Sequence, residues 1–186
     1  MPLGLTRGKA VVVDCDPQWP TLFEEERARI SSAIGDIVAG VHHVGSTSIP
    51  GMAAKPILDI AVMLREFQDG ERCIGPLESI GYTHRGLNPD IPGDRFFVKG
   101  LPPREGGSRG KEVRTHILHM YPLDSPLAQN HLAFRDCLIA QPKLAAEYMQ
   151  LKLALADRHP DDRVSYGKGK ASFIRAVLAK AAGELQ

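Results

Sequence analysis

The chain has 186 residues, of which 43% are hydrophobic and 24% charged, a composition typical of one soluble domain with a single core. Lys and Arg total 23 against 22 Asp and Glu, so the formal net charge is +1, which argues against a dedicated nucleic-acid-binding protein. No apolar run approaches the ~18 residues of a membrane span, and Met1 to Lys9 lacks the apolar core of a signal peptide, so we expect a cytoplasmic protein without a membrane partner.

Strands and helices alternate in the first part of the chain. The β-branched run at 9–14 predicts a strand, and Asp16 and Pro17 predict the N-cap and the first residue of a helix whose apolar residues recur every three or four positions. Two further strands and the end of a second helix, with Gly81 as its stop, are predicted in this order: 40–44, 56–64 and 76–80.

Glycine and proline dominate the middle of the chain, and helices its end. Ten of the thirty residues from Arg85 to Arg114 are Gly or Pro, so we expect two surface loops around a short strand at 96–98. A strand follows at 114–121. The remaining segments are predicted to be helices: 126–140, 142–158 and 164–182.

The predicted helix at 142–158 has an apolar stripe, formed by Leu144, Tyr148, Leu151 and Leu155, with Lys152 placed away from it. The order of all these elements predicts an α+β fold, a small mixed β-sheet with packed helices. We expect a single domain, 1–186, with a sheet-containing core at 1–124 and a helical C-terminal region at 125–186.

The segment 42–64 carries most of the chemical information. A strand runs into a Gly-Ser-Thr turn, and the next strand carries one carboxylate, Asp59. Such a turn lets backbone N–H groups and hydroxyls approach a phosphate closely. A carboxylate in an apolar strand is costly unless it is paired or binds a metal, so Asp59 is either a ligand or base, or is neutralised by a neighbouring cation. The phosphate-binding candidates of this segment are Gly45, Ser46, Thr47 and Lys55.

The same segment carries a resemblance to a known superfamily. Val44-Gly45-Ser46 is followed after twelve residues by Asp59-Ile60-Ala61-Val62, an order similar to the nucleotidyltransferase signature. More closely, the whole chain resembles the GrpB family of bacterial nucleotidyltransferase-like proteins, which also occurs fused to some dephospho-CoA kinases. The blocks that carry this resemblance are, in chain order, Asp16-Pro17-x-Trp19, His43 to Thr47, Ile49 to Ile60, Arg95 to Gly100, Arg114 to His119, His131 to Asp136, Tyr148, Lys152, Tyr166, Lys170 and Phe173.

The resemblance implies a nucleotidyltransferase-like fold with a cleft between the Gly45 turn and the Asp59 strand. Active nucleotidyltransferases place two carboxylates two residues apart on this strand, where side-chain alternation gives both the same face, and a third on a neighbouring strand. The second position is Ala61 in this chain. The sequence therefore departs from the carboxylate set of the usual two-metal transfer mechanism.

Histidines on the strand predicted at 114–121 could supply other ligands. His116 and His119 are three residues apart, so a regular strand points them to opposite faces. We expect His119 to be catalytic together with Asp59, either binding a divalent metal such as Mg, Mn or Zn or forming a metal-free acid–base pair. The other histidine candidates for the cleft are His43 and His116.

Basic residues near the glycine-rich loops could bind a triphosphate or an acidic substrate, with solvated surface charge as the alternative interpretation. These residues are Arg95, Lys99 and Arg114. Tyr166 and Lys170 belong to the last predicted helix, and because the family resemblance includes both, we expect the C-terminal helices to bring them over the cleft.

Three functions follow from these observations. The first is binding of a nucleotide or another phosphorylated small molecule, with nucleotidyl transfer to a small acceptor as the reaction. The second is a non-catalytic binding or folding-support module with a protein partner, indicated by Ala61. The third is a metal-dependent phosphoester hydrolase built on Asp59, His116 and His119.

Overall fold

β3 (Leu58–Leu64) is buried on both faces and organises the sheet. In the computed structural model, which describes residues 3–88, 94–101 and 112–183, its even-numbered side chains pack into a hydrophobic cluster with α1 (Trp19–Ile34). Its odd-numbered Ala61 and Met63 pack into a second cluster with α3 (Pro126–Ala140). Each face of the sheet is therefore covered by a helix, as burial of two apolar faces requires.

The sheet has six strands in the order β2–β3–β6–β5–β4, with β1 added beside β6. β3 and β6 are parallel, and the other neighbouring pairs are antiparallel. The strands other than β3 are β1 (Leu5–Thr6), β2 (Val38–Val44), β4 (Tyr82–Leu87), β5 (Arg95–Leu101) and β6 (Val113–Pro122). The mixed sheet with packed helices confirms the predicted α+β fold.

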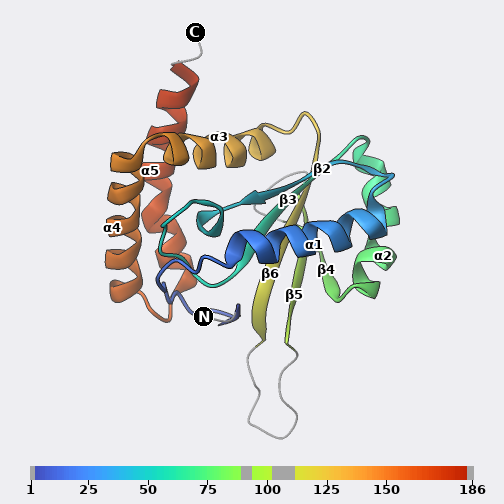
Figure 1. The fold of residues 1–186 in the computed structure, drawn as a ribbon, viewed down its shortest axis with the longest axis horizontal. Helices are drawn as coiled ribbons and strands as arrows, with labels where there is room; N and C mark the ends of the chain where they lie inside the picture. The colour runs from blue at the N-terminus through green and yellow to red at the C-terminus, as the bar shows by residue number, and fades with distance from the viewer. Residues whose placement is uncertain (1–2, 89–93, 102–111, 184–186) are drawn as a thin grey trace, which may run out of the picture.

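The remaining helices lie at the two ends of the molecule. α2 and the 3₁₀ turn before it lie at one end, and α4 and α5 run side by side at the other (Figure 1). α3 connects with this helical end and packs against α5. The bounds of these elements are η1 (Ser46–Ser48), η2 (Phe67–Cys73), α2 (Ile74–Ser79), α4 (Pro142–Arg158) and α5 (Arg163–Gly183).

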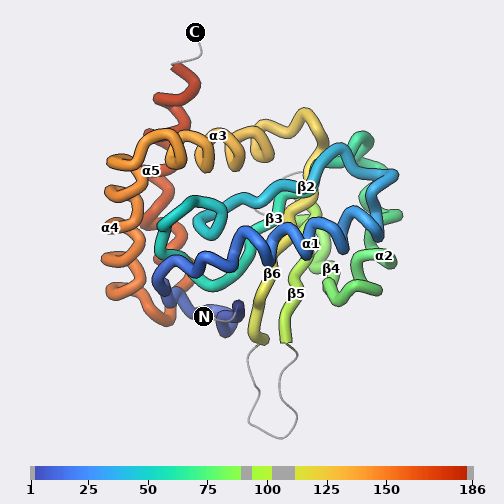
Figure 2. The backbone as a smooth tube through the Cα atoms, in the orientation of Figure 1, coloured from blue at the N-terminus to red at the C-terminus, as the bar shows by residue number. Residues whose placement is uncertain are grey.

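The strand predicted at 9–14 is wrong. Within this segment the Ala10 N–H donates to the Pro160 carbonyl oxygen, in the turn between α4 and α5, at 2.7 Å. Towards the sheet it forms only an isolated bridge, between Val13 and Ala54. The tube in Figure 2 shows this N-terminal segment passing beside the turn between α4 and α5.

Two other boundaries differ from the predictions. The first helix begins at Trp19, because Asp16 accepts a hydrogen bond from the Gln18 N–H (2.9 Å) in a turn that precedes the helix. β4 was not predicted, because a bulge at Gly86 (φ +85°) interrupts its alternation. The predicted Gly- and Pro-rich loops fall mostly on 89–93 and 102–111, outside the described residues. None of the described helices is both long enough and apolar enough to cross a membrane.

Candidate functional site

The turn after β2 lies directly against the Asp59 side chain. Gly45 has φ +71°, a backbone conformation that glycine adopts without strain. A Cβ atom at Gly45 would lie 2.5 Å from Asp59 Oδ2, so a larger residue has no room. The hydroxyl of Ser48 donates to the Gly45 carbonyl oxygen (2.6 Å) and closes the turn. The predicted juxtaposition of the Gly-Ser turn and the carboxylate is therefore present.

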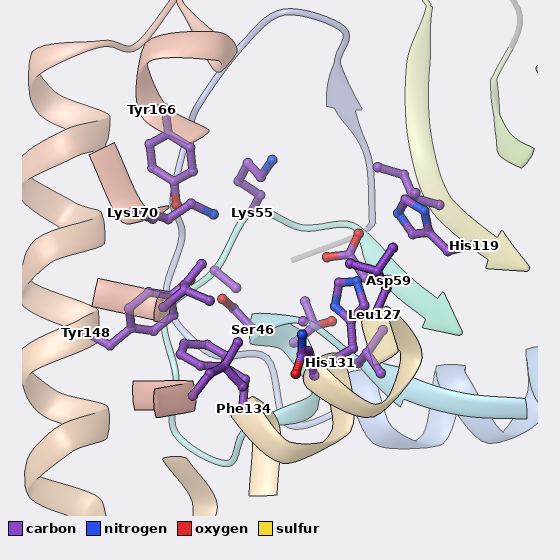
Figure 3. A pocket seen from close by; sticks show the side chains of 18 of the residues that line it. Ser46, Lys55, Asp59, His119, Leu127, His131, Phe134, Tyr148, Tyr166 and Lys170 are labelled. Carbon is purple, nitrogen blue, oxygen red and sulfur yellow. The ribbon is translucent and has the colours of Figure 1, made fainter. Parts of the chain in front are cut away.

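A pocket of about 400 Å³ opens over this turn, on the α3 face of the sheet. Its floor is formed by Gly45, Ser46, Thr47 and Asp59, and its wall by residues of β6, α3 and α5. Figure 3 shows the Asp59 carboxylate and the Lys170 amino group facing the same open space. The pocket therefore joins the sequence segment 42–64 to the C-terminal helices, as the resemblance implied.

Among the described residues, three cationic side chains line the pocket: Lys55, Arg163 and Lys170. The Lys170 and Lys55 ammonium groups lie 4.7 Å and 5.5 Å from the centre of the Tyr166 ring, within the range of cation–π contact. Burial and the neighbouring Lys55 together lower the pKa of Lys170 to about 8, whereas Asp59 opposes the shift. Burial also lowers the pKa of Lys55. An anion bound here would relieve this crowding of positive charge.

Lys152 adds a buried amino group behind the same wall. It is fully buried on α4, where its ammonium group donates to the Ala53 carbonyl oxygen and lies 5.1 Å from the centre of the Tyr148 ring. The prediction that Lys152 points away from the apolar stripe is wrong, because it is four residues after Tyr148 and three before Leu155 and so shares their face. Burial, with smaller contributions from Lys170 and Lys55, lowers its pKa to about 7.

His119 reaches the pocket from β6 and is paired with a carboxylate that the sequence analysis missed. His119 Nδ1 lies 2.8 Å from Oδ2 of Asp94, which is fully buried. An ionised carboxylate only accepts hydrogen bonds, so Nδ1–H donates and Nε2 is left unprotonated in the neutral ring. Nε2 has no hydrogen-bond partner within the described residues. The one signal in the sequence was an acidic residue placed just before the strand at 96–98.

A second histidine, His131 on α3, completes this side of the pocket. Its ring stacks on that of His119 with 6.1 Å between centres, and its Nε2 lies 3.2 Å from the Tyr121 hydroxyl. Burial lowers the pKa of His131, and the nearby His119 adds to the shift. In the sequence, His131 lies in one of the blocks that carry the GrpB resemblance, and it is not among the predicted site residues. The structure brings it to the pocket beside His119.

The end of the pocket away from His119 is aromatic and apolar. Phe134 and Tyr148 form an edge-to-face pair with 5.1 Å between ring centres. Ile174 and Leu178 of α5 extend this surface, and Ser46 lies between it and the cationic wall (Figure 3). A flat organic group fits such a surface, because aromatic side chains stack on it with favourable offset or edge geometry.

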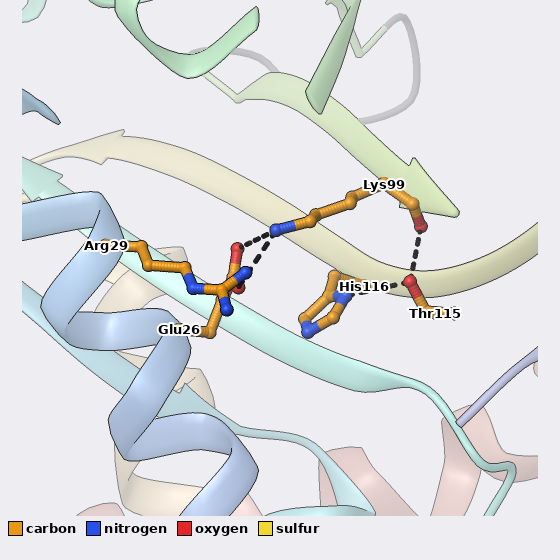
Figure 4. Close-up of polar contacts among 5 residues, drawn as sticks. All are labelled: Glu26, Arg29, Lys99, Thr115 and His116. Atoms are coloured by element: carbon orange, nitrogen blue, oxygen red, sulfur yellow. Dashed lines mark hydrogen bonds and ion pairs between the residues drawn. The ribbon is translucent and has the colours of Figure 1, made fainter. Parts of the chain in front are cut away.

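Two of the basic candidates lie on the opposite face of the sheet. Lys99 pairs with Glu26 of α1 at 2.8 Å (Figure 4), and Arg95 pairs with Glu71 at 2.7 Å. β5 side chains alternate, and Arg95 and Lys99 share the face that α1 and α2 cover. Neither lines the pocket. Arg114 pairs with Glu112 (2.9 Å) in a small neighbouring cavity and does not line the pocket either.

The histidine candidates also separate. His116 points to the α1 face, where its Nδ1 lies 2.8 Å from the Thr115 hydroxyl (Figure 4). His43 stacks on Phe23 (4.6 Å between ring centres), and its Nε2 lies 3.0 Å from Thr47 Oγ1. Burial lowers the pKa of each ring to about 4. Since His116 and His119 face opposite sides, they cannot bind one metal ion, which removes the basis of the hydrolase hypothesis.

The side chains that could ligate metal in this pocket do not fit the two divalent cations of the usual nucleotidyl-transfer mechanism. Among the described residues that line the pocket, Asp59 is the single carboxylate. Ala61, at the second position, is fully buried, and β6 presents His119 beside it. Within the described residues, no group of three His, Cys, Asp or Glu side chains could hold a metal ion. Two divalent cations need several carboxylates, and this set falls short of them.

Similar proteins identify the family. The family model described as GrpB protein matches residues 9–180. The chain belongs to the GrpB family. It is 40% identical to a UPF0157 protein of Pseudomonas aeruginosa over 91% of this chain and 66% of that protein, so it spans less than two thirds of that relative. It is 33% identical to the glutamate-rich protein GrpB of Alkalihalophilus pseudofirmus, over 95% of this chain and 98% of that one. A dephospho-CoA kinase of Mycolicibacterium paratuberculosis is 27% identical over 95% of this chain and 47% of the kinase, in agreement with the expected fusion.

Solved structures confirm the fold. A GrpB crystal structure from Enterococcus faecalis has a TM-score of 0.81 and 33% identity, covering 94% of this chain and 99% of that one. The Cid1 poly(U) polymerase has a TM-score of 0.50 at 10% identity, covering 79% of this chain and 43% of the polymerase. The GrpB chain therefore has a nucleotidyltransferase-like fold.

Proposed function

We propose that this GrpB protein binds a nucleotide or another phosphorylated small molecule in the pocket above Asp59. The observation that carries the proposal is the convergence of three features on one cavity: the Gly45–Ser46 turn, the Lys55 and Lys170 ammonium groups, and the paired His119. Turns of this kind and lysines both stabilise phosphate oxygens. The aromatic end at Phe134 and Tyr148 would hold the base or another flat group.

The proposed reaction is transfer of a nucleotidyl group to a small acceptor. The acceptor's hydroxyl oxygen attacks the α-phosphorus, its proton passes to His119 Nε2, and the bond from phosphorus to the leaving pyrophosphate oxygen breaks. The Asp94 carboxylate stabilises the imidazolium that forms, because it accepts the Nδ1–H hydrogen bond. Asp59 holds the Lys55 and Lys170 ammonium groups by electrostatic attraction. These two groups neutralise the charge that develops on the phosphate.

Binding is tested by thermal shift and calorimetry with a panel of nucleoside triphosphates and other phosphorylated metabolites, each in magnesium and in chelator. A ligand at ~100 times its Kd adds about 2.7 kcal/mol of stability, a shift of several degrees for a domain of this size. Ser46→Ala should weaken binding about tenfold, the usual effect of losing one hydrogen bond to a charged group. Ser79→Ala, an exposed hydroxyl on α2, is the matched control. If no compound in the panel raised the unfolding temperature or bound in calorimetry, the proposal would be contradicted.

The reaction is tested by pyrophosphate release in the presence of a pool of small acceptors. His119→Gln keeps a polar group of similar size and removes the base. Release should fall at least a hundredfold, with the affinity for the triphosphate kept within about twofold. Release that survives this change would assign the proton transfer to another group.

A non-catalytic binding module is the second candidate, and Ala61 supports it. The similarity to part of a dephospho-CoA kinase adds a context in which such a module would act on an attached domain. This candidate predicts that a ligand binds but that no acceptor leads to pyrophosphate release. It also predicts that ligand binding changes the stability of an attached kinase domain, and that the empty pocket does not.

A further inference from the structure

The pocket is already cationic without a bound metal ion. Lys55, Arg163 and Lys170 carry positive charge, and Asp59 is the one carboxylate among the described residues lining the pocket. Sites rich in carboxylates carry net negative charge instead, and they need divalent cations before an anionic phosphate can bind. The charge balance here attracts a phosphate directly.

The Lys55 and Lys170 ammonium groups are held at the place where a divalent cation would otherwise neutralise the phosphate. Both ammonium groups contact the Tyr166 ring, which fixes their position from α5. Each interacts electrostatically with Asp59, the carboxylate at the floor. In Figure 3 the Lys170 amino group and the Asp59 carboxylate face one space, in which a phosphate oxygen would lie. Lys55 lies on the segment that leads from the turn into β3, and it lines the same pocket as Lys170 and Asp59.

We infer that the pocket binds its phosphorylated ligand as the free anion, with the Lys55 and Lys170 ammonium groups in the role that divalent cations have in carboxylate-rich nucleotidyltransferase sites. This inference rests on the proposed function and specifies the form of its ligand. Ala61 is explained by the same arrangement: with the charge supplied by lysines, a second carboxylate would only weaken the attraction for the phosphate. The ligand class is an uncomplexed polyphosphate ester.

The test measures binding of two probes, ATP and inorganic tripolyphosphate, by calorimetry in excess EDTA and in excess magnesium chloride. We expect both to bind in EDTA. Magnesium should weaken tripolyphosphate binding several-fold, because the complex carries less negative charge than the free anion. Binding in magnesium alone overturns this inference and leaves the proposed function standing. No binding in either buffer contradicts both.

Variants distinguish further between a site that binds the free anion and a site that binds the metal complex. Lys170→Met keeps the length of the side chain and removes its charge, and it should weaken ATP binding in EDTA about tenfold or more. Lys168→Met removes an exposed charge two residues away on the same helix and is the matched control. Equal affinities for these two variants would overturn the role of Lys170.

Asp59→Asn gives the sharpest contrast. If the phosphate binds as a free anion, removing the one negative charge of the floor tightens binding in EDTA. If a metal bridges Asp59 to the phosphate, the same change weakens binding about tenfold or more, and that result would overturn the inference. The thermal unfolding of each unliganded variant confirms that the fold is intact before binding is compared.

Discussion

Asp94 Oδ2 accepts a hydrogen bond from His119 Nδ1 at 2.8 Å, across the boundary between β5 and β6. Asp94 is fully buried, and its other oxygen, Oδ1, has no hydrogen-bond partner among the described residues. A buried carboxylate with one orphan oxygen is costly to fold. Asp94 Oδ2 also accepts a hydrogen bond from Asn88 Nδ2 at 2.9 Å, so the carboxylate is held in place where it fixes the tautomer of the His119 ring.

The first prediction concerns that tautomer. Asp94→Ala removes the acceptor of the Nδ1 proton, so the neutral His119 ring should shift towards the Nε2–H form, which cannot accept a proton from a substrate. Nitrogen-15 chemical shifts of the imidazole ring measure the change, and pyrophosphate release should fall at least tenfold. Asp94→Asn keeps a carbonyl acceptor and should preserve the wild-type tautomer. An unchanged ring in Asp94→Ala would show that another group fixes it.

The second prediction tests the contact between the turn and the carboxylate. Gly45→Ala combines a strained φ with a Cβ atom that overlaps the Asp59 side chain, whereas Gly51, also at φ +71°, has nothing within 4 Å of the added atom. Gly51→Ala therefore reports the strain alone, about 1–2 kcal/mol. Gly45→Ala should lower the free energy of unfolding by at least ~2 kcal/mol more. Denaturant titration measures both, and equal losses would mean that Asp59 moves aside freely.

The sequence predicts most of the fold because local signals there agree with tertiary packing. Proline at each helix start predicts the first residues of α3 and α4, and the apolar stripe of the second helix supports its length. The β-branched run at 9–14 has the composition of a strand. Its backbone nevertheless bonds to Pro160, in the turn between α4 and α5, and to Ala54, which lies outside the named strands. Periodicity reports which residues are buried, and it does not report which backbone groups they will meet.

The part of the candidate site that comes from one segment of the chain can be predicted from the sequence. The part that depends on how neighbouring strands pair cannot. Ser46, Lys55 and Asp59 come from one stretch of chain, and the structure brings them to one pocket. Arg95 and Lys99 were predicted as phosphate ligands because they lie near the glycine-rich loops, but the pairing of β5 with β6 turns them to the opposite face. That pairing could not be read from the sequence, and the same pairing is what brings Asp94 to His119.

The third prediction tests the missing carboxylate. Ala61 is fully buried in the apolar cluster beneath α3, so Ala61→Asp should lower the free energy of unfolding by about 3 kcal/mol or more in chelator. A carboxylate two residues from Asp59 on the same face creates a pair of metal ligands. Magnesium or manganese should then restore part of the lost stability. Ala61→Asn has the same shape without the charge and should show no such recovery, which thermal unfolding with and without metal measures.

The fourth prediction concerns the buried Lys152. Burial lowers its pKa from 10.5 to about 7, so between these values the unfolded chain keeps a proton that the folded chain has released. The free energy of unfolding therefore rises with pH between these two values, by about 1.4 kcal/mol per pH unit where the folded and unfolded chains differ by one whole proton. Below about pH 7 the destabilisation caused by burying this amino group is fully present. Lys152→Met should make this rise smaller than in the wild type, leaving the part that the lowered pKa values of Lys170 and Lys55 contribute. Lys143→Met, an exposed lysine on the same helix, should keep it. Denaturant unfolding from pH 6 to 10 measures the three slopes, and parallel curves for wild type and Lys152→Met would show that the amino group stays charged inside the fold.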